Sequence, residues 1–388
     1  MYRLNVKKEK HRYVLEELAK EFLRPEEYEV FVEEKAETAE GSSDQQKIAA
    51  GEKKALSEEQ RRTENEERDA EKRRVFDELA ELTGYRPEWG TLTGVRPAKL
   101  VNEMMDGGLS EEETAEIFRR RYYVSEEKID LLLETCRNQR FLTSVSAENT
   151  AGVYIGIPFC PTRCLYCSFA SNQASGEAME RYLQALLTEI EAVGAKFRSL
   201  GIVPESLYVG GGTPTSLSAF ALERLLSCAV ESFDLSEVRE FCVEAGRPDT
   251  ITGEKLSVMR HYGVDRVSVN PQSMNDVTLK AIGRSHTVEE ICRAFEMVRQ
   301  SGIPHVNADI IAGLPGEDYA MFLYTLKSVI ALGPDNITVH TLAVKRASRL
   351  KEQNENYHYE NAAGVGRMVT DARRILAENG YFPYYMYR

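Results

Sequence analysis

Three cysteines lie within eight positions of the stretch GIPFCPTRCLYCSFAS, which begins at residue 156. Cys160, Cys164 and Cys167 follow the spacing C-x3-C-x2-C, and the other cysteines of the chain are scattered. Three thiolates in one loop can hold an iron–sulfur cluster that leaves one iron open to another ligand. A structural zinc site normally has four protein ligands, and four-cysteine ferredoxin runs differ in spacing and number. The spacing favours a cluster. A zinc site completed by a distant histidine and ordinary packed cysteines are the alternatives.

Charged residues in three later stretches are further candidates for ligand contacts. Asp309 lies inside the apolar run NADIIAG, where an acid is costly unless it is bonded. Glu244 ends the run FCVE, and Arg284 lies in IGRSHT, where its planar guanidinium suits a carboxylate. A solvated acid for Glu244 and a surface salt bridge for Arg284 are the alternatives. For His286, a capping or loop role is favoured over zinc binding.

The run YVGGGTPTSL offers glycines that allow the backbone to approach a ligand closely. It lacks the G-x4-G-K-[ST] pattern of a nucleotide phosphate loop. An ordinary tight turn is the alternative to a ligand-binding loop.

These candidates follow strand-like runs that alternate with helical patterns from residue 150 onward. Alternating strands and helices predict a parallel sheet with right-handed crossovers. Six units are too few for a complete eight-unit barrel, so we expect an α/β fold with a partial (β/α)6 TIM-like barrel. A doubly wound sheet is the alternative. In both folds, ligands bind at the carboxyl ends of the strands, where the candidate residues lie. The six strand-like runs are 153–157, 206–210, 240–245, 265–269, 306–312 and 336–342.

The region before the barrel differs in character. Residues 1–35 have a strand, helix and strand pattern, and Ser110 followed by Glu113 predicts the start of a later helix. The chain stops in the aromatic run GYFPYYMYR, so we expect it to be truncated. The expected segments are a small α+β N-terminal part at 1–35, a charged linker or exposed helix at 36–75, a helical region at 76–147, the barrel at 148–350, and the start of a C-terminal substrate region at 351–388.

Charge and hydropathy limit the function classes. The net charge of −13 argues against a duplex nucleic-acid partner. The sequence contains neither an apolar run of about 20 residues nor the blocks of a signal peptide. We therefore expect a cytoplasmic protein without nucleic-acid or membrane partners. Thiols stay reduced in the cytosol, which favours metal binding over disulfides for the clustered cysteines.

C-x3-C-x2-C after one strand, with a glycine triplet after the next, resembles the radical SAM superfamily over roughly 150–388. Together with VEAG, PQS, IGRSHT and AGLPG, these motifs resemble the oxygen-independent coproporphyrinogen III oxidase-like group. The resemblance implies a 4Fe–4S cluster on the three cysteines. The amino and carboxylate groups of S-adenosylmethionine (SAM) would occupy the fourth iron. Reduction of the cluster would cleave SAM and yield a radical that abstracts hydrogen from the substrate.

The same resemblance implies which residues contact SAM. Glu244 and Asp309 would bond ribose hydroxyls, or the SAM ammonium in the case of Glu244, and Arg284 would pair with the carboxylate. The full set of implied SAM contacts is Tyr154, Tyr166, Gly211, Gly212, Thr213, Glu244, Gln272, Arg284, Asp309 and Ala343.

The implied activity is oxidative decarboxylation of coproporphyrinogen III to protoporphyrinogen IX in anaerobic haem biosynthesis. It requires a tetrapyrrole substrate and an electron donor such as a flavodoxin or ferredoxin. The candidates for binding the carboxylates of the substrate are Arg247, Lys345, Arg346 and Arg349.

Two departures from the oxidase pattern leave other functions open. The oxidase branch usually has His where Gly156 stands and a further Cys where Phe169 stands. Some relatives with Phe at that position carry haem. A haem-binding carrier of the same family, or an enzyme acting on another tetrapyrrole or small molecule, are the alternatives.

Overall fold

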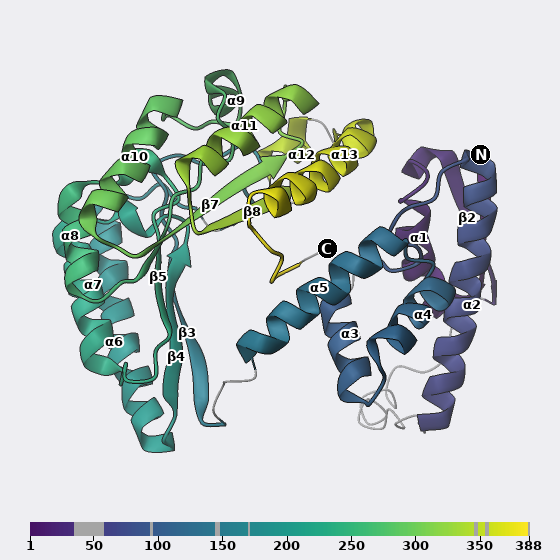
Figure 1. The fold of residues 1–388 in the computed structure, drawn as a ribbon, viewed down its shortest axis with the longest axis horizontal. Coiled ribbons are helices and arrows are strands. Elements are labelled where there is room, and N and C mark those ends of the chain that lie inside the picture. Colours follow the sequence, from purple (N-terminus) through teal and green to yellow (C-terminus); the bar gives the residue numbers. More distant parts are fainter. Residues whose placement is uncertain are drawn as a thin grey trace, which may run out of the picture. The chain divides into compact units, whose positions relative to one another are not determined.

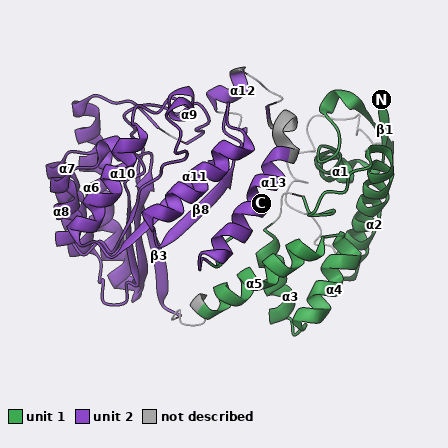
Figure 2. Cartoon of the chain, turned by 45° about the horizontal axis from the view of Figure 1, so that its top comes forward, with its two compact units in different colours: residues 1–145, 382–388 green, residues 146–381 purple. Residues whose placement is uncertain are grey.

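The computed structural model describes residues 1–34, 58–93, 96–143, 148–169, 171–344, 348–353 and 357–386. The chain divides into two compact units (Figure 2). Unit 1 comprises residues 1–145 and 382–388, and unit 2 comprises residues 146–381. The finer division into five segments stays a prediction.

Unit 1 begins with the predicted strand, helix and strand: β1 (Tyr2–Lys8), α1 (Arg12–Ala19) and β2 (Tyr28–Glu34). The two strands pair in parallel, and Leu4 lies opposite Val30. Because side chains alternate along a strand, β1 turns Leu4 and Val6 toward α1 and α2 (Glu58–Thr83). This small sheet thus has one packed face.

Helix α2 covers part of the segment predicted as a charged linker or exposed helix. Residues 35–57 lie outside the described residues, and the residues from Glu58 onward form a helix. The helix is not solvated throughout, since Glu71 is buried and accepts hydrogen bonds from the Lys7 amide at 2.6 Å and from His11 Nδ1 at 2.8 Å. The buried Glu71 carboxylate thus provides a hydrogen-bond acceptor for the backbone at the end of β1. Composition alone does not predict this contact.

The rest of unit 1 is helical, with α3 (Pro97–Asp106), α4 (Glu111–Tyr122) and α5 (Glu126–Thr143). Ser110 and Glu113 form the predicted capping box at the start of α4. Cys136 is buried in the core of these helices, and burial raises the pKa of its thiol to about 11, as expected for a packed side chain. The C-terminal segment joins this core, where Met386 packs and the Pro383 carbonyl accepts a hydrogen bond from Asn138 Nδ2 at 2.7 Å.

Unit 2 contains a six-stranded parallel sheet in the order β3-β4-β5-β6-β7-β8, so each new strand pairs with the preceding one. Helices lie outside the curve of this sheet (Figure 1). The strands and helices of unit 2 are β3 (Thr150–Ile157), α6 (Gly176–Leu200), β4 (Val203–Gly211), α7 (Ala219–Ser232), β5 (Glu240–Glu244), α8 (Gly253–His261), β6 (Arg266–Ser268), α9 (Asp276–Ala281), α10 (Val288–Ser301), β7 (His305–Ala312), α11 (Tyr319–Leu332), β8 (Asn336–Thr341), α12 (Arg349–Gln353) and α13 (Tyr357–Glu378).

Six strand–helix units in sequential order confirm the predicted partial barrel. Along β3 to β7, one set of alternate residues is apolar and buried, such as Leu207, Val267 and Ala308, whereas Ile337 and Val339 of β8 are partly buried. These residues hold the helices against the sheet. The opposite face, called the inner face below, carries polar residues such as Tyr208 and Asp309. Alternation along the strands therefore separates core from candidate site.

None of the described helices has both the length and the apolar character required to cross a bilayer.

Candidate active site

The three cysteines lie in the loop that follows β3, at the carboxyl ends of the strands. The Asn172 carbonyl accepts a hydrogen bond from the Cys160 amide at 3.2 Å, and the Cys164 carbonyl accepts one from the Cys167 amide at 3.2 Å. All three thiols are free and half-buried. Within the described residues, His, Cys, Asp and Glu side chains form no group of three or more arranged around a single metal ion. The loop thus holds three available thiols without forming a preformed single-ion site.

The glycine run after β4 lies directly against this cysteine loop. The Gly212 amide donates to the Ile157 carbonyl at 2.7 Å, and the Thr213 amide donates to the Phe159 carbonyl at 2.7 Å. A Cβ atom at Gly212 would lie 2.5 Å from the Phe159 oxygen and 3.0 Å from Cys160 Sγ. The Thr213 hydroxyl lies 3.3 Å from the same sulfur. The predicted glycines are therefore required for the close approach of the two loops.

The residue before Gly212 adopts a backbone conformation that also requires glycine. Gly211 has φ +113°, and a Cβ atom there would lie 2.8 Å from the Ile157 carbonyl oxygen. A side chain at this position would be strained and would clash with β3.

Arg284 lies under the cysteine loop and is buried, so the surface salt bridge considered from the sequence is wrong. Its Nη1 donates to the carbonyls of Gly246 at 3.1 Å and Asn270 at 2.7 Å, and its Nη2 lies 3.4 Å from the Tyr166 hydroxyl. Burial raises the pKa of that tyrosine. Arg284 thus orients Tyr166, the aromatic residue before the third cysteine.

Three buried polar atoms at the end of β6 have no hydrogen-bond partner among the described residues: Arg284 Nε, Asn270 Oδ1 and Gln272 Oε1. Buried polar groups are normally satisfied, so each such atom needs an explanation. Gln272 also has φ +67°, a backbone conformation that residues other than glycine rarely adopt outside functional or strained positions. A donor and two acceptors left open here fit a polar ligand that carries both kinds of group, as the amino acid part of SAM does.

Glu244 and two tyrosines line the inner face beside the glycine run. The Tyr208 hydroxyl donates to Glu244 Oε1 at 2.5 Å, and the Tyr208 ring stacks on Tyr154 with centroids 5.7 Å apart. Tyr154 is 63% exposed, so it offers a free aromatic surface. Burial raises the pKa of Glu244, because a charged carboxylate is disfavoured away from water. Tyr208 was not predicted as a site residue, because its place beside Tyr154 and Glu244 depends on the register of three neighbouring strands.

Asp309 lies on the inner face of β7 and is bonded, as its apolar strand requires. Asn307 Nδ2 donates to its Oδ1 at 2.9 Å, and His340 Nε2 lies 3.6 Å from its Oδ2. Burial alone would raise the pKa of Asp309, but the contacts with His340, Asn307 and Thr338 outweigh burial and leave the pKa below its ordinary value. A ribose contact of Asp309 stays a prediction.

The other predicted residues take different positions. Arg247 is buried against Asp249, so it does not present a free charge to a substrate. Ala343 lies beyond β8 and is exposed, and Arg349 is exposed at the start of α12. Lys345 and Arg346 lie outside the described residues.

The sheet, its cysteine loop and its glycine run define a class of protein. Residues 154–329 match the Radical SAM superfamily, so this part of unit 2 is a radical SAM domain. Such domains use a 4Fe–4S cluster and SAM. The loop of three thiols, the close approach at Gly212 and the open polar atoms near Arg284 fit this cofactor pair.

Individual proteins give a more specific comparison than the superfamily does. The chain is 41% identical over 313 residues to the oxygen-independent coproporphyrinogen-III oxidase-like protein HemZ of Bacillus subtilis (strain 168), covering 79% of this chain and 62% of that protein. It is 31% identical to the heme chaperone HemW of Lactococcus lactis subsp. lactis (strain IL1403), covering 60% of each protein. The chain thus spans about three fifths of the length of these two relatives.

The solved structure of the coproporphyrinogen III oxidase HemN from Escherichia coli is also similar. It aligns with a TM-score of 0.53 and 26% sequence identity, over 63% of this chain and 56% of that one. This match agrees with the partial barrel.

Proposed function

We propose that this chain belongs to a cytoplasmic radical SAM enzyme that oxidatively decarboxylates coproporphyrinogen III to protoporphyrinogen IX. Two propionate side chains of the tetrapyrrole would become vinyl groups. The similarity to HemZ and to the HemN structure supports this substrate class. A flavodoxin or ferredoxin would supply electrons.

The observation that carries the proposal is the assembly of three loops at one end of the sheet, namely the cysteine loop, the glycine run and the segment with Arg284. Cys160, Cys164 and Cys167 would hold the cluster, which together with SAM supplies one-electron chemistry when bound. Gly212 brings the second loop against the cysteines. Arg284 orients Tyr166 and leaves its Nε available for a SAM carboxylate.

Residues on the inner face would bind and orient the remaining parts of the ligands. Glu244 is fixed by Tyr208 and can accept hydrogen bonds from ribose hydroxyls or from an ammonium group. Asp309 is held by Asn307 for the same kind of contact. The exposed ring of Tyr154 offers a surface on which a planar group can stack.

A second candidate function is haem carriage, and one residue favours it. Phe169, which replaces the further cysteine of the oxidase branch, is 71% exposed two positions beyond Cys167. An exposed aromatic ring suits contact with a planar tetrapyrrole, and the similarity to HemW agrees. Gly156, the other departure, has room for a side chain, because a Cβ atom there would meet only the Tyr154 ring, at 3.5 Å.

An anaerobic assay tests the enzyme against the carrier. The protein is reconstituted with iron and sulfide and then mixed with SAM, a reductant and coproporphyrinogen III. We expect 5′-deoxyadenosine and protoporphyrinogen IX, both measured by chromatography. Tight haem binding with neither product would reject the enzyme and support the carrier. 5′-Deoxyadenosine without protoporphyrinogen would reject this substrate but retain SAM cleavage.

A further inference from the structure

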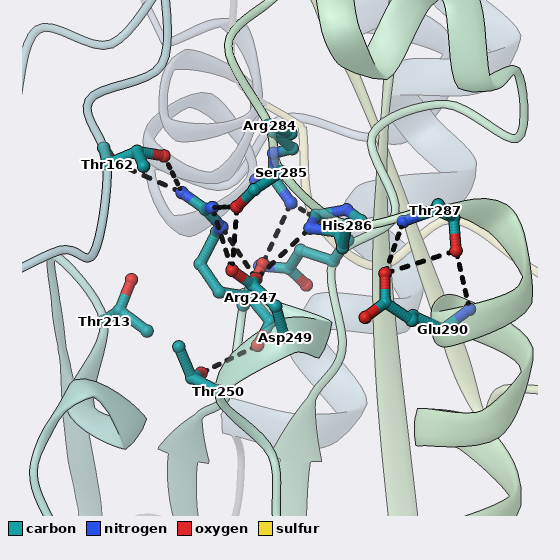
Figure 3. A network of polar contacts seen from close by, with 12 residues as sticks. Thr162, Thr213, Arg247, Asp249, Thr250, Arg284, Ser285, His286, Thr287 and Glu290 are labelled. Atoms are coloured by element: carbon teal, nitrogen blue, oxygen red, sulfur yellow. Dashed lines mark hydrogen bonds and ion pairs between the residues drawn. The ribbon is translucent and has the colours of Figure 1, made fainter.

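Asp249 is the centre of a polar network beside the cysteine loop (Figure 3). Arg247 donates to both carboxylate oxygens, from Nε to Oδ1 and from Nη2 to Oδ2, each at 3.2 Å. Ser285 Oγ donates to Oδ2 at 3.1 Å, and His286 Nδ1 lies 3.3 Å from Oδ1. Two parallel hydrogen bonds fix the plane of the guanidinium as well as its position. The Arg247–Asp249 ion pair therefore fixes the direction in which Arg247 Nη1 points.

The Nη1 group of Arg247, which does not contact Asp249, reaches the cysteine loop. Its Nη1 donates to Thr162 Oγ1 at 2.8 Å and to the Thr162 carbonyl at 3.3 Å. The Thr162 hydroxyl in turn donates to the Gly283 carbonyl at 3.1 Å. Thr162 lies midway between Cys160 and Cys164, so one hydroxyl links the thiol-bearing segment to two other loops.

These contacts join parts of the chain that are far apart in sequence. Thr162 is 85 residues from Arg247 and 121 residues from Gly283. The Arg247 side chain is 3% exposed and that of Asp249 is 20% exposed. A buried ion pair is weak support for stability, because desolvation offsets most of the attraction. Its fixed geometry, by contrast, defines where Thr162 must lie.

We propose that Thr162, Arg247, Asp249 and Ser285 form a clamp that positions the Cys160–Cys164 segment before any cluster binds. We call this set the loop clamp. Its members are positioning residues, since they act on the thiols through the backbone at Thr162. The proposal concerns the cluster loop and holds for either substrate considered above.

Thr162→Val is the decisive variant, because it keeps the shape of the side chain and removes only the hydroxyl. Hydrogen exchange of the cluster-free protein measures the amides of residues 163–167, including the Leu165 amide that bonds the Ile282 carbonyl. We expect exchange to become about tenfold faster, as for the loss of a hydrogen bond to a charged donor. Thr162→Ser restores the hydroxyl and should restore slow exchange. Thr188→Val, on the outer helix α6, is the matched control.

A second measurement uses the reconstituted protein and follows loss of cluster absorbance after a chelator is added. Thr162→Val should lose the cluster several-fold faster than the parent protein. If Thr162→Val does not fold, Ser285→Ala serves instead, with a smaller shift in the same direction. Unchanged exchange in the folded variant, or a Thr162→Ser protein as fast as Thr162→Val, would overturn the proposal. Failure of the substrate assay alone would leave these results untouched.

Discussion

The glycines at the site are needed because a side chain would clash with neighbouring atoms, and Gly212 is the most crowded of them. A methyl group at this position would press on the Phe159 carbonyl at 2.5 Å and on Cys160 Sγ at 3.0 Å. Gly212→Ala must therefore push the two loops apart, which we expect to cost about 1–3 kcal/mol of stability. The variant should also retain less than about half of the iron after reconstitution, since displacement of Cys160 weakens one of the three ligands. Iron analysis and thermal melting measure the two effects.

Gly253→Ala is the control for this prediction, because a Cβ atom there meets nothing within 4 Å. Equal iron content in both variants would contradict the assigned role of Gly212.

Glu244 predicts a pH dependence of stability. Burial raises the pKa of Glu244 in the folded protein. The folded state thus binds a proton more tightly than the unfolded state, and stability falls as pH rises from the unfolded pKa through the folded one. Glu244→Gln removes this loss, so the variant should gain melting temperature over the parent protein at about pH 8 and not at about pH 4.

Thermal melts of the cluster-free proteins across this pH range test the prediction for Glu244. Glu289→Gln, at a side chain that is 82% exposed, is the control. A difference between Glu244→Gln and the parent that stays constant with pH would argue against a buried carboxylate.

At the scale of elements, sequence patterns predicted the strands well and the pairing of side chains poorly. The six predicted runs coincide with β3 to β8, because β-branched, apolar and aromatic residues between helical patterns favour strands. Arg247 was considered a free cation, whereas its partner Asp249 stands two residues later across a short turn, Pro248–Thr250. Such a pairing depends on turn geometry, which residue types alone do not specify.

The buried polar atoms of the site that lack a hydrogen-bond partner could not be predicted from the residue types either. Asn270 and Gln272 follow β6, and their lack of partners depends on how the loop after the strand bends. Strand register aligns Gly156 with Gly210 and Tyr154 with Tyr208. Once register is known, the inner face can be read from alternation, but one sequence does not determine register.

The C-terminal segment of unit 1 allows a prediction at this scale. Asn138→Ala removes the hydrogen bond to the Pro383 carbonyl and should destabilise unit 1 by about 1 kcal/mol. Trp89 is the single tryptophan of the chain and packs on the same core, so its fluorescence during urea unfolding reports on this unit. Gln300→Ala, in α10 of unit 2, should leave the tryptophan transition unchanged. A transition unaffected by Asn138→Ala would indicate that the segment adds nothing to the stability of unit 1.

At the scale of the whole molecule, each unit has its own core. The core of unit 2 draws on residues between Val153 and Leu376, and the two cores of unit 1 draw on other residues. A fragment of residues 148–381 should therefore fold alone and bind the same amount of iron per chain as the full protein. Circular dichroism and iron analysis test this, with the Cys164→Ala fragment as the control without a complete ligand set. An unfolded fragment would show that unit 2 depends on unit 1.

The sequential strand order has a consequence for the timing of assembly. Because every strand pairs with the one made just before it, the sheet can grow stepwise, without first joining distant ends of the chain. The cysteine loop is the exception, since it belongs to the first strand but hydrogen-bonds to a loop 121 residues later. The three thiols precede these later loops in the chain, so we expect them to reach their final arrangement only after those loops have formed. We therefore expect metal loading at this site to follow the folding of most of the barrel.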